Sequence, residues 1–114
     1  MKITQFEDII AWQKSRELFN FVYSDFRDCK DFAFRDQIQR AVVSIANNIA
    51  EGFERRGDKE FKRFLFMSKG SCGEVRSLLY FALDLNYIDK VTFEKNYTLA
   101  FEVSKILSGF IKTL

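Results

Sequence analysis

The side chains best suited to chemistry in this sequence are cationic, and five of them lie close together along the chain. They fall within nine residues and are Arg55, Arg56, Lys59, Lys62 and Arg63. Guanidinium and ammonium groups bind phosphate oxygens, so such a cluster is typical of a surface that contacts a nucleic-acid backbone. Arg40 adds a sixth cation to this candidate set. Because Glu54, Asp58 and Glu60 dilute the cluster, the alternative is an ordinary solvated corner between two helices.

Two adjacent asparagines, Asn47 and Asn48, lie in the middle of a helical pattern although asparagine is a poor helix former. Asn48 falls on the core side of the pattern, between Ile45 and Ile49, and Asn47 lies on its flank. A buried amide without partners costs about 1–3 kcal/mol, so Asn48 should bond to Ser44 or to a serine of another helix. We expect it to fix helix register, as a seam asparagine does in coiled coils; ligand binding is the alternative.

The residues needed for most catalytic and metal sites are missing. The chain has no histidine, which excludes Ser/His and Cys/His nucleophiles, Glu-x-x-His di-iron sites and histidine-containing zinc sites. Cys29 and Cys72 lack any ligand spacing and are expected to be free thiols, with Cys72 buried. Glu51 is expected to form a surface pair with Arg55 at the i, i+4 spacing. Paired carboxylates could still do acid–base work, but no pair stands out, so we expect no enzyme activity, metal or cofactor.

Four helices must position these side chains. The absence of proline and the low count of 5 glycines favour helix over turn-rich structure. Apolar residues recur at three- and four-residue steps and predict helices at about 7–27, 34–54, 58–85 and 91–112. Gly57 should close the second helix in a left-handed conformation, and Asp58 should cap the third. Short connections join antiparallel neighbours, so we expect a single all-α domain over residues 1–114, an antiparallel up-down-up-down four-helix bundle.

The expected second and third helices each carry an additional apolar stripe beside the core positions. Its members are small or aromatic, and are Val43, Ala46, Ala50 and Phe53 on one helix and Phe66, Gly70, Gly73, Ser77 and Tyr80 on the other. Small residues allow close helix approach and aromatic ones add contact area, so we expect a homo-oligomer. Deeper packing within one chain is the alternative. An oligomer would repeat the cationic cluster and add its charges together.

The net charge of +2 permits a polyanionic partner without requiring one. No stretch approaches the roughly 18 apolar residues of a membrane span, and the N-terminal residues do not form a signal peptide. We therefore expect a cytoplasmic protein that makes no membrane contact. Phe53 and Phe61 flank the cationic cluster, where they would either stack on bases or be buried.

Four segments resemble a known family of bacterial proteins. They are FEDIIAWQKSREL (6–18), QIQRAVVSIANNIAEGFERR (37–56), EFKRFLFMSKGSCGE (60–74) and LNYID (85–89). The Ala-Trp-Gln of the first and the Asn-Ile-Ala-Glu-Gly of the second resemble the signature of 23S ribosomal RNA intervening-sequence proteins, a family of four-helix bundles. The chain departs from that pattern at Ala46, where the family usually has proline, and at Gln39, where it often has arginine.

The family is similar to the accessory protein of diversity-generating retroelements, a barrel-shaped pentamer with a basic surface. The resemblance implies a homopentamer that associates with RNA or DNA and with a partner protein such as a reverse transcriptase. Together with the residues above, it predicts a non-catalytic oligomeric bundle that binds nucleic acid through backbone phosphates. The alternative is a protein-interaction scaffold or adaptor without direct nucleic-acid contact.

Overall fold

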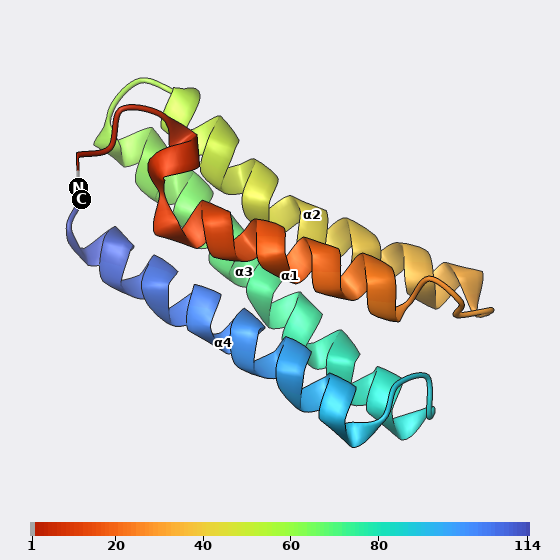
Figure 1. The fold of residues 1–114 in the computed structure, drawn as a ribbon. Helices are drawn as coiled ribbons and strands as arrows, with labels where there is room; N and C mark the ends of the chain where they lie inside the picture. Colours follow the sequence, from red (N-terminus) through yellow and green to blue (C-terminus); the bar gives the residue numbers. More distant parts are fainter. Residues whose placement is uncertain (1) are drawn as a thin grey trace.

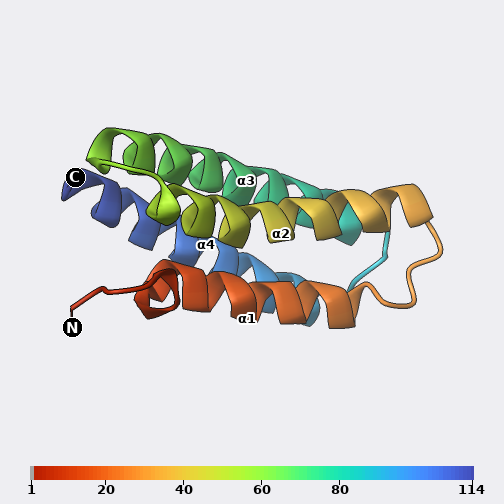
Figure 2. The same ribbon diagram turned by 90° about the horizontal axis from the view of Figure 1, so that it is seen from above.

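The computed structural model describes residues 2–114, which form one short 3-10 helix and four α-helices. They are η1 (Phe6–Asp8), α1 (Ile10–Asp25), α2 (Phe32–Glu54), α3 (Asp58–Asp84) and α4 (Lys90–Lys112). Consecutive helices run antiparallel, and α1 packs against α4 to close the bundle (Figures 1 and 2). The predicted all-α up-down-up-down bundle is therefore confirmed. The molecule is elongated, with extents of 43 × 23 × 19 Å.

Both termini lie at one end of the bundle, beside the α2–α3 turn, and the other two interhelical loops lie at the opposite end (Figures 1 and 2). Each helix buries one stripe of apolar side chains at three- and four-residue spacing, which is the amphipathic pattern of a bundle. Among the fully buried side chains are Leu18, Phe26, Ile38, Ile45, Leu65, Leu79 and Leu107. Cys72 is also buried, and this burial raises the pKa of its thiol to about 12. The thiol is consequently protonated and unreactive at neutral pH.

The first helix begins later than the periodicity predicts. The Asp8 carboxylate accepts hydrogen bonds from the backbone N–H groups of Thr4 (3.0 Å) and Gln5 (3.2 Å), which stabilise the separate turn η1. Ile9 then adopts an extended conformation, with its side chain buried, before α1 starts. Local side-chain bonding to the backbone has therefore interrupted a segment whose apolar pattern continues.

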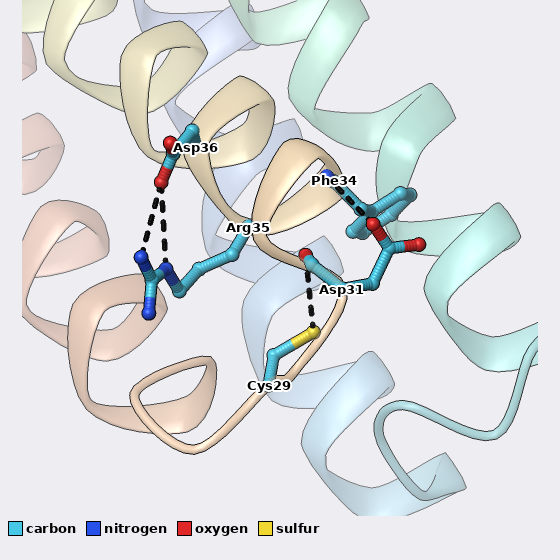
Figure 3. Close-up of polar contacts among 5 residues, drawn as sticks. All are labelled: Cys29, Asp31, Phe34, Arg35 and Asp36. Atoms are coloured by element: carbon cyan, nitrogen blue, oxygen red, sulfur yellow. Dashed lines mark hydrogen bonds and ion pairs between the residues drawn. The ribbon is translucent and has the colours of Figure 1, made fainter.

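Two of the four α-helices begin after an aspartate whose side chain caps them. Asp31 accepts a bond from Phe34 N (3.1 Å) and begins α2 two residues earlier than predicted, as Figure 3 shows. Asp89 caps α4 in the same way through Thr92 N (2.8 Å). Gly57 has the predicted positive φ, 85°, but it does not close α2. That helix ends at Glu54 with Arg55 as its extended C-cap, and Gly57 is the residue before α3. The prediction that Asp58 caps α3 is wrong. Gly57 occupies the N-cap position, so this helix has no side-chain cap, and Asp58 is its first residue.

None of the helices within residues 2–114 combines the length and apolar character needed to cross a lipid bilayer.

Candidate nucleic-acid interface

The predicted cationic cluster of Arg55, Arg56, Lys59, Lys62 and Arg63 surrounds the turn between α2 and α3, at the end of the bundle where the termini also lie. We call this cluster the α2–α3 corner. The guanidinium of Arg55, after the last residue of α2, lies 5.0 Å from the centre of the Phe64 ring. The guanidinium of Arg63, on the first turns of α3, lies 4.9 Å from the same centre. Cation–π contacts of this kind restrict long flexible side chains. One buried ring therefore positions two exposed guanidinium groups from different helices.

Phe64 can occupy this place because α2 has a glycine opposite it. A Cβ built on Gly52 would lie 2.5 Å from the Phe64 Cβ and 3.2 Å from the Phe61 ring. No other residue type would allow the two helices to approach so closely here. Gly52 therefore allows Phe64 to lie where its ring contacts both guanidinium groups.

Acidic residues neutralise part of the cluster. Arg63 donates two hydrogen bonds to Glu60, at 3.2 and 3.1 Å, and this bonding lowers the pKa of the Glu60 carboxyl, helped by the positive charge of Arg63 and Arg55. Arg55 lies 3.7 Å from Glu51, in an exposed i, i+4 pair. Exposed pairs contribute at most about 1 kcal/mol and compete weakly with a phosphate.

The remaining three cations of the corner are without carboxylate partners. Arg56, Lys59 and Lys62 form no ion pair with any residue between 2 and 114. Arg56 and Lys59 are exposed, whereas Lys62 is half-buried beside the turn. Phe61 is buried and Phe53 half-buried, their rings in edge-to-face contact 5.8 Å apart, so neither is free to stack on a base.

Arg40 does not belong to the corner. It precedes Arg55 by fifteen residues along α2, about 22 Å at the helical rise. It lines two open hollows of about 660 and 490 Å³, which share only Arg40 and Ser44. Glu74 lines the first and Glu51 the second, and these carboxylates make the surroundings of Arg40 unsuited to a chain of phosphates.

Asn48 lies at the edge between α2 and α3, half-buried, rather than on the core seam. Its Nδ2 donates to the carbonyl oxygen of Ser44 (2.8 Å) and to the Ser44 hydroxyl (3.0 Å). That hydroxyl also accepts a bond from Ser71 of α3 (2.9 Å), and Ser68 donates to the carbonyl oxygen of Ile45 (2.7 Å). Asn48 is therefore one end of a small polar network joining the two helices. Its neighbour Asn47 is exposed.

The completely buried asparagine is Asn96 of α4, which the sequence pattern missed. Its Nδ2 donates to Asp25 of α1 (2.9 Å) and to the carbonyl oxygen of Thr92 (2.9 Å). The predicted α4 stripe ran through Tyr97, which is half-buried on the α3 side. The available signal was that Asn96 precedes the buried Val103 by seven residues, on the same helix face.

The two predicted interface stripes differ in exposure. On α2 all four positions are half-buried, and Phe53 packs against the core. On α3 Phe66, Gly70, Ser77 and Tyr80 are exposed, and Gly73 is half-buried. On and next to α3 and α4, the further exposed apolar side chains are Met67, Phe81, Leu85, Val91 and Phe101. Leu85 continues the apolar pattern of α3 but is exposed because α3 ends at Asp84. The α3 stripe is consequently the more accessible of the two.

No group of three or more His, Cys, Asp or Glu side chains within residues 2–114 is arranged to hold a metal ion. The fold and the surface together define a small four-helix bundle with a cationic corner. A family model described as "23S rRNA-intervening sequence protein" matches residues 7–109, and the chain belongs to this family.

Comparison with solved structures supports the same fold. A protein of unknown function from the S23 ribosomal protein family of Bacteroides thetaiotaomicron superposes with a TM-score of 0.85 at 24% sequence identity. The similarity covers 90% of this chain and 99% of that protein. A search of curated proteins found no match.

Proposed function

We propose that this protein is a non-catalytic homo-oligomer that binds RNA or DNA through backbone phosphates. The observation that carries the proposal is the organisation of the α2–α3 corner. Phe64 holds the guanidinium groups of Arg55 and Arg63 in place, and three cations without carboxylate partners lie beside them. Binding of this kind depends on the charge of the backbone and not on the base sequence, because the contacts are to phosphates.

Self-association would strengthen a surface of modest charge by repeating it. The outer surface of α3 supports this part of the proposal, since Phe66 is 54% and Phe81 53% exposed. A fully exposed aromatic side chain offers about 150–250 Å² of surface, and monomers rarely leave several of these uncovered on one helix. A pentamer is the assembly that the family resemblance suggests, and light scattering would measure the number of subunits directly.

Salt dependence and charge reversal test the nucleic-acid part. Affinity for a fluorescent oligonucleotide should fall with salt, with a log–log slope of about −0.7 to −0.9 per phosphate contacted. Reversal of Arg55, Arg56 and Arg63 to glutamate should abolish binding at moderate salt. The matched control reverses Arg16, Arg27 and Lys30, which changes net charge equally on other parts of the surface. Equal loss in both variants would exclude the corner as the binding surface, as would retained binding in the first.

The alternative function is a scaffold or adaptor whose oligomer contacts another protein. The exposed apolar side chains of α3 favour it, because they suit a protein partner better than a phosphate chain. A reverse transcriptase is the partner class that the family resemblance suggests. A complex that survives nuclease treatment and high salt in a pull-down would support this function over the first.

A further inference from the structure

A second row of cations follows the boundary between α3 and α4. On α3 these residues recur every seven positions, and are Lys62, Lys69 and Arg76; on α4 they are Lys105 and Lys112, also seven apart. Residues seven apart share a helix face. The guanidinium of Arg76 lies 5.3 Å from the Phe101 ring centre of α4, so the α3 row faces α4. Lys105 approaches the same ring, also at 5.3 Å.

Within residues 2–114, none of the five cations of this row takes part in an ion pair. Two acids of these helices are directed elsewhere: Glu102 pairs with Lys14 of α1 at 3.4 Å, and Glu74 lines the hollow beside α2. Two others share the faces of the row, Asp58 four residues before Lys62 and Glu94 seven residues before Phe101, so the cations outnumber the acids five to two. The row therefore differs from the α2–α3 corner, where Glu51 and Glu60 occupy two of the arginines.

Four aromatic rings continue the row toward the far end of the bundle. Tyr80 of α3 lies 5.0 Å from Phe93 and 5.4 Å from Tyr97, measured between ring centres. Phe93 and Tyr97 stack at 5.3 Å, and Phe101 follows at 6.3 Å from Tyr97. Tyr80 is 50% and Phe101 45% exposed. The rings thus form a contiguous surface that is still accessible at both edges.

Arg76 connects the cationic and aromatic parts. Its guanidinium also lies 6.0 Å from the Tyr97 ring centre. Its Nε–H is buried and has no hydrogen-bond acceptor among the residues that the structure describes. Contact with rings on α4 therefore joins the cationic row of α3 to the aromatic surface.

We propose that a single strand of nucleic acid lies along this α3–α4 boundary, with bases stacked on the aromatic surface and phosphates bound by the cationic row. The inference rests on the proposed function and specifies its ligand. Aromatic rings interleaved with cations are the usual means of binding single strands, whose base faces are accessible. In a duplex those faces are already stacked. Lys62 belongs to both the corner and the row, so a strand could continue from one to the other, over about 27 Å from Lys62 to Tyr80.

A second copy of the chain is a less suitable occupant of the same surface. A symmetric contact would place the five cations of one protomer near the same five of the other, and Asp58 and Glu94 would compensate only part of this charge. Charge complementarity therefore favours a polyanion here. Subunit contacts would then use the uncharged part of the α3 stripe around Gly70.

The test compares an oligodeoxythymidylate with a duplex of equal length by fluorescence anisotropy. Phe101→Leu, which keeps an apolar side chain but removes the ring, should weaken binding of the single strand about tenfold and leave duplex binding unchanged. Lys69→Gln with Lys105→Gln should reduce the salt slope by about 0.7 for each lysine that contacts a phosphate. The matched controls are Phe32→Leu, which removes an exposed ring at the start of α2, away from the α3–α4 boundary, and Lys30→Gln in the α1–α2 loop.

The other outcomes separate this inference from the proposed function. If both probes bind the wild type equally and only the corner reversals weaken them, the α3–α4 surface is excluded and the proposed function stands. If the wild type binds neither probe at low salt, both fail. If Phe101→Leu dissociates the oligomer in light scattering, the α3–α4 surface is a subunit contact and the inference is overturned.

Discussion

Gly52 shows how one residue without a side chain decides a contact between two helices. Its position in α2 faces Phe64, and the Cβ of that residue, attached directly to the α3 backbone, cannot move aside independently. The same residue allows Phe64 to be buried beneath the guanidinium groups of Arg55 and Arg63. The glycine of the Asn-Ile-Ala-Glu-Gly segment is therefore explained by packing.

We predict that Gly52→Ala destabilises the protein by about 1–3 kcal/mol, because overpacking must separate α2 from α3. Urea denaturation would measure the change in the free energy of unfolding. The control is Gly109→Ala in α4, where an added Cβ has no neighbour within 4 Å and alanine improves helix propensity by about 1 kcal/mol. If Gly52→Ala is as stable as this control, the close approach does not constrain the fold.

At the scale of the elements, the bundle end opposite the corner is held by a contact between two loops. The Tyr87 hydroxyl, in the α3–α4 connection, donates to the Asp31 carboxylate of the α1–α2 connection at 2.6 Å. Asp31 also caps α2 through Phe34 N, as Figure 3 shows, and the adjacent Cys29 thiol contacts the Asp31 carbonyl oxygen at 3.8 Å. Hydrogen bonding from Tyr87, followed by that from Phe34, lowers the pKa of Asp31 below its usual 3.8.

This lowered pKa makes the contact dependent on pH. The carboxyl of Asp31 is ionised more readily in the folded chain than in the unfolded one, so the stabilisation is complete above the unfolded pKa. It is lost as the pH falls through the lower, folded pKa. Acid should therefore weaken the loop contact and the cap together, since both use the ionised form.

We predict that Tyr87→Phe lowers the melting temperature at pH 7, and that its difference from the wild type shrinks as the pH falls below 3.8 and through the lower, folded pKa of Asp31. Thermal denaturation followed by circular dichroism over this range would show the effect. Tyr23→Phe is a suitable control because the Tyr23 hydroxyl makes no hydrogen bond within residues 2–114. A difference that stays constant with pH would mean that Tyr87 stabilises the loops through packing against Phe34 alone, whose ring centre lies 5.3 Å away.

At the scale of the whole molecule, the proposed assembly can be tested at glycines that the protomer itself does not need. An added Cβ at Gly70 or Gly73 would meet no atom within 4 Å, so packing inside the bundle does not require glycine there. Close approach of a helix from another subunit would require it. The two positions therefore report on assembly with little effect on the fold of one chain.

We predict that Gly70→Leu combined with Gly73→Leu keeps the helical content and reduces the molecular mass in solution toward that of one chain. Light scattering and circular dichroism would measure the two quantities on the same sample. Gly109→Leu, whose added Cβ is equally free of neighbours, should leave the mass unchanged. An unaltered mass in the double variant would show that the subunits meet on another surface.

The positions of the helices, several of their ends and the composition of the α2–α3 corner were predictable from local information. Apolar spacing and capping side chains act within one or two turns, so the Asp89 cap and the Arg55–Arg63 segment could be predicted along the chain. Two local patterns gave wrong predictions. Hydrogen bonds to the Asp8 carboxylate interrupt a segment whose apolar pattern is continuous. Aspartate is a common N-cap residue, but Asp58 lies one position after the N-cap of α3.

The pairing of helix faces was decided only by the folded chain. Arg76 and Phe101 are far apart in the sequence and meet because α3 and α4 are antiparallel and rotated with these residues toward each other. The burial of Asn96 rather than Asn48 has the same origin. Periodicity determines which residues share a face, but the rotation of each helix about its axis depends on contacts such as that of Gly52 with Phe64, which no single segment contains.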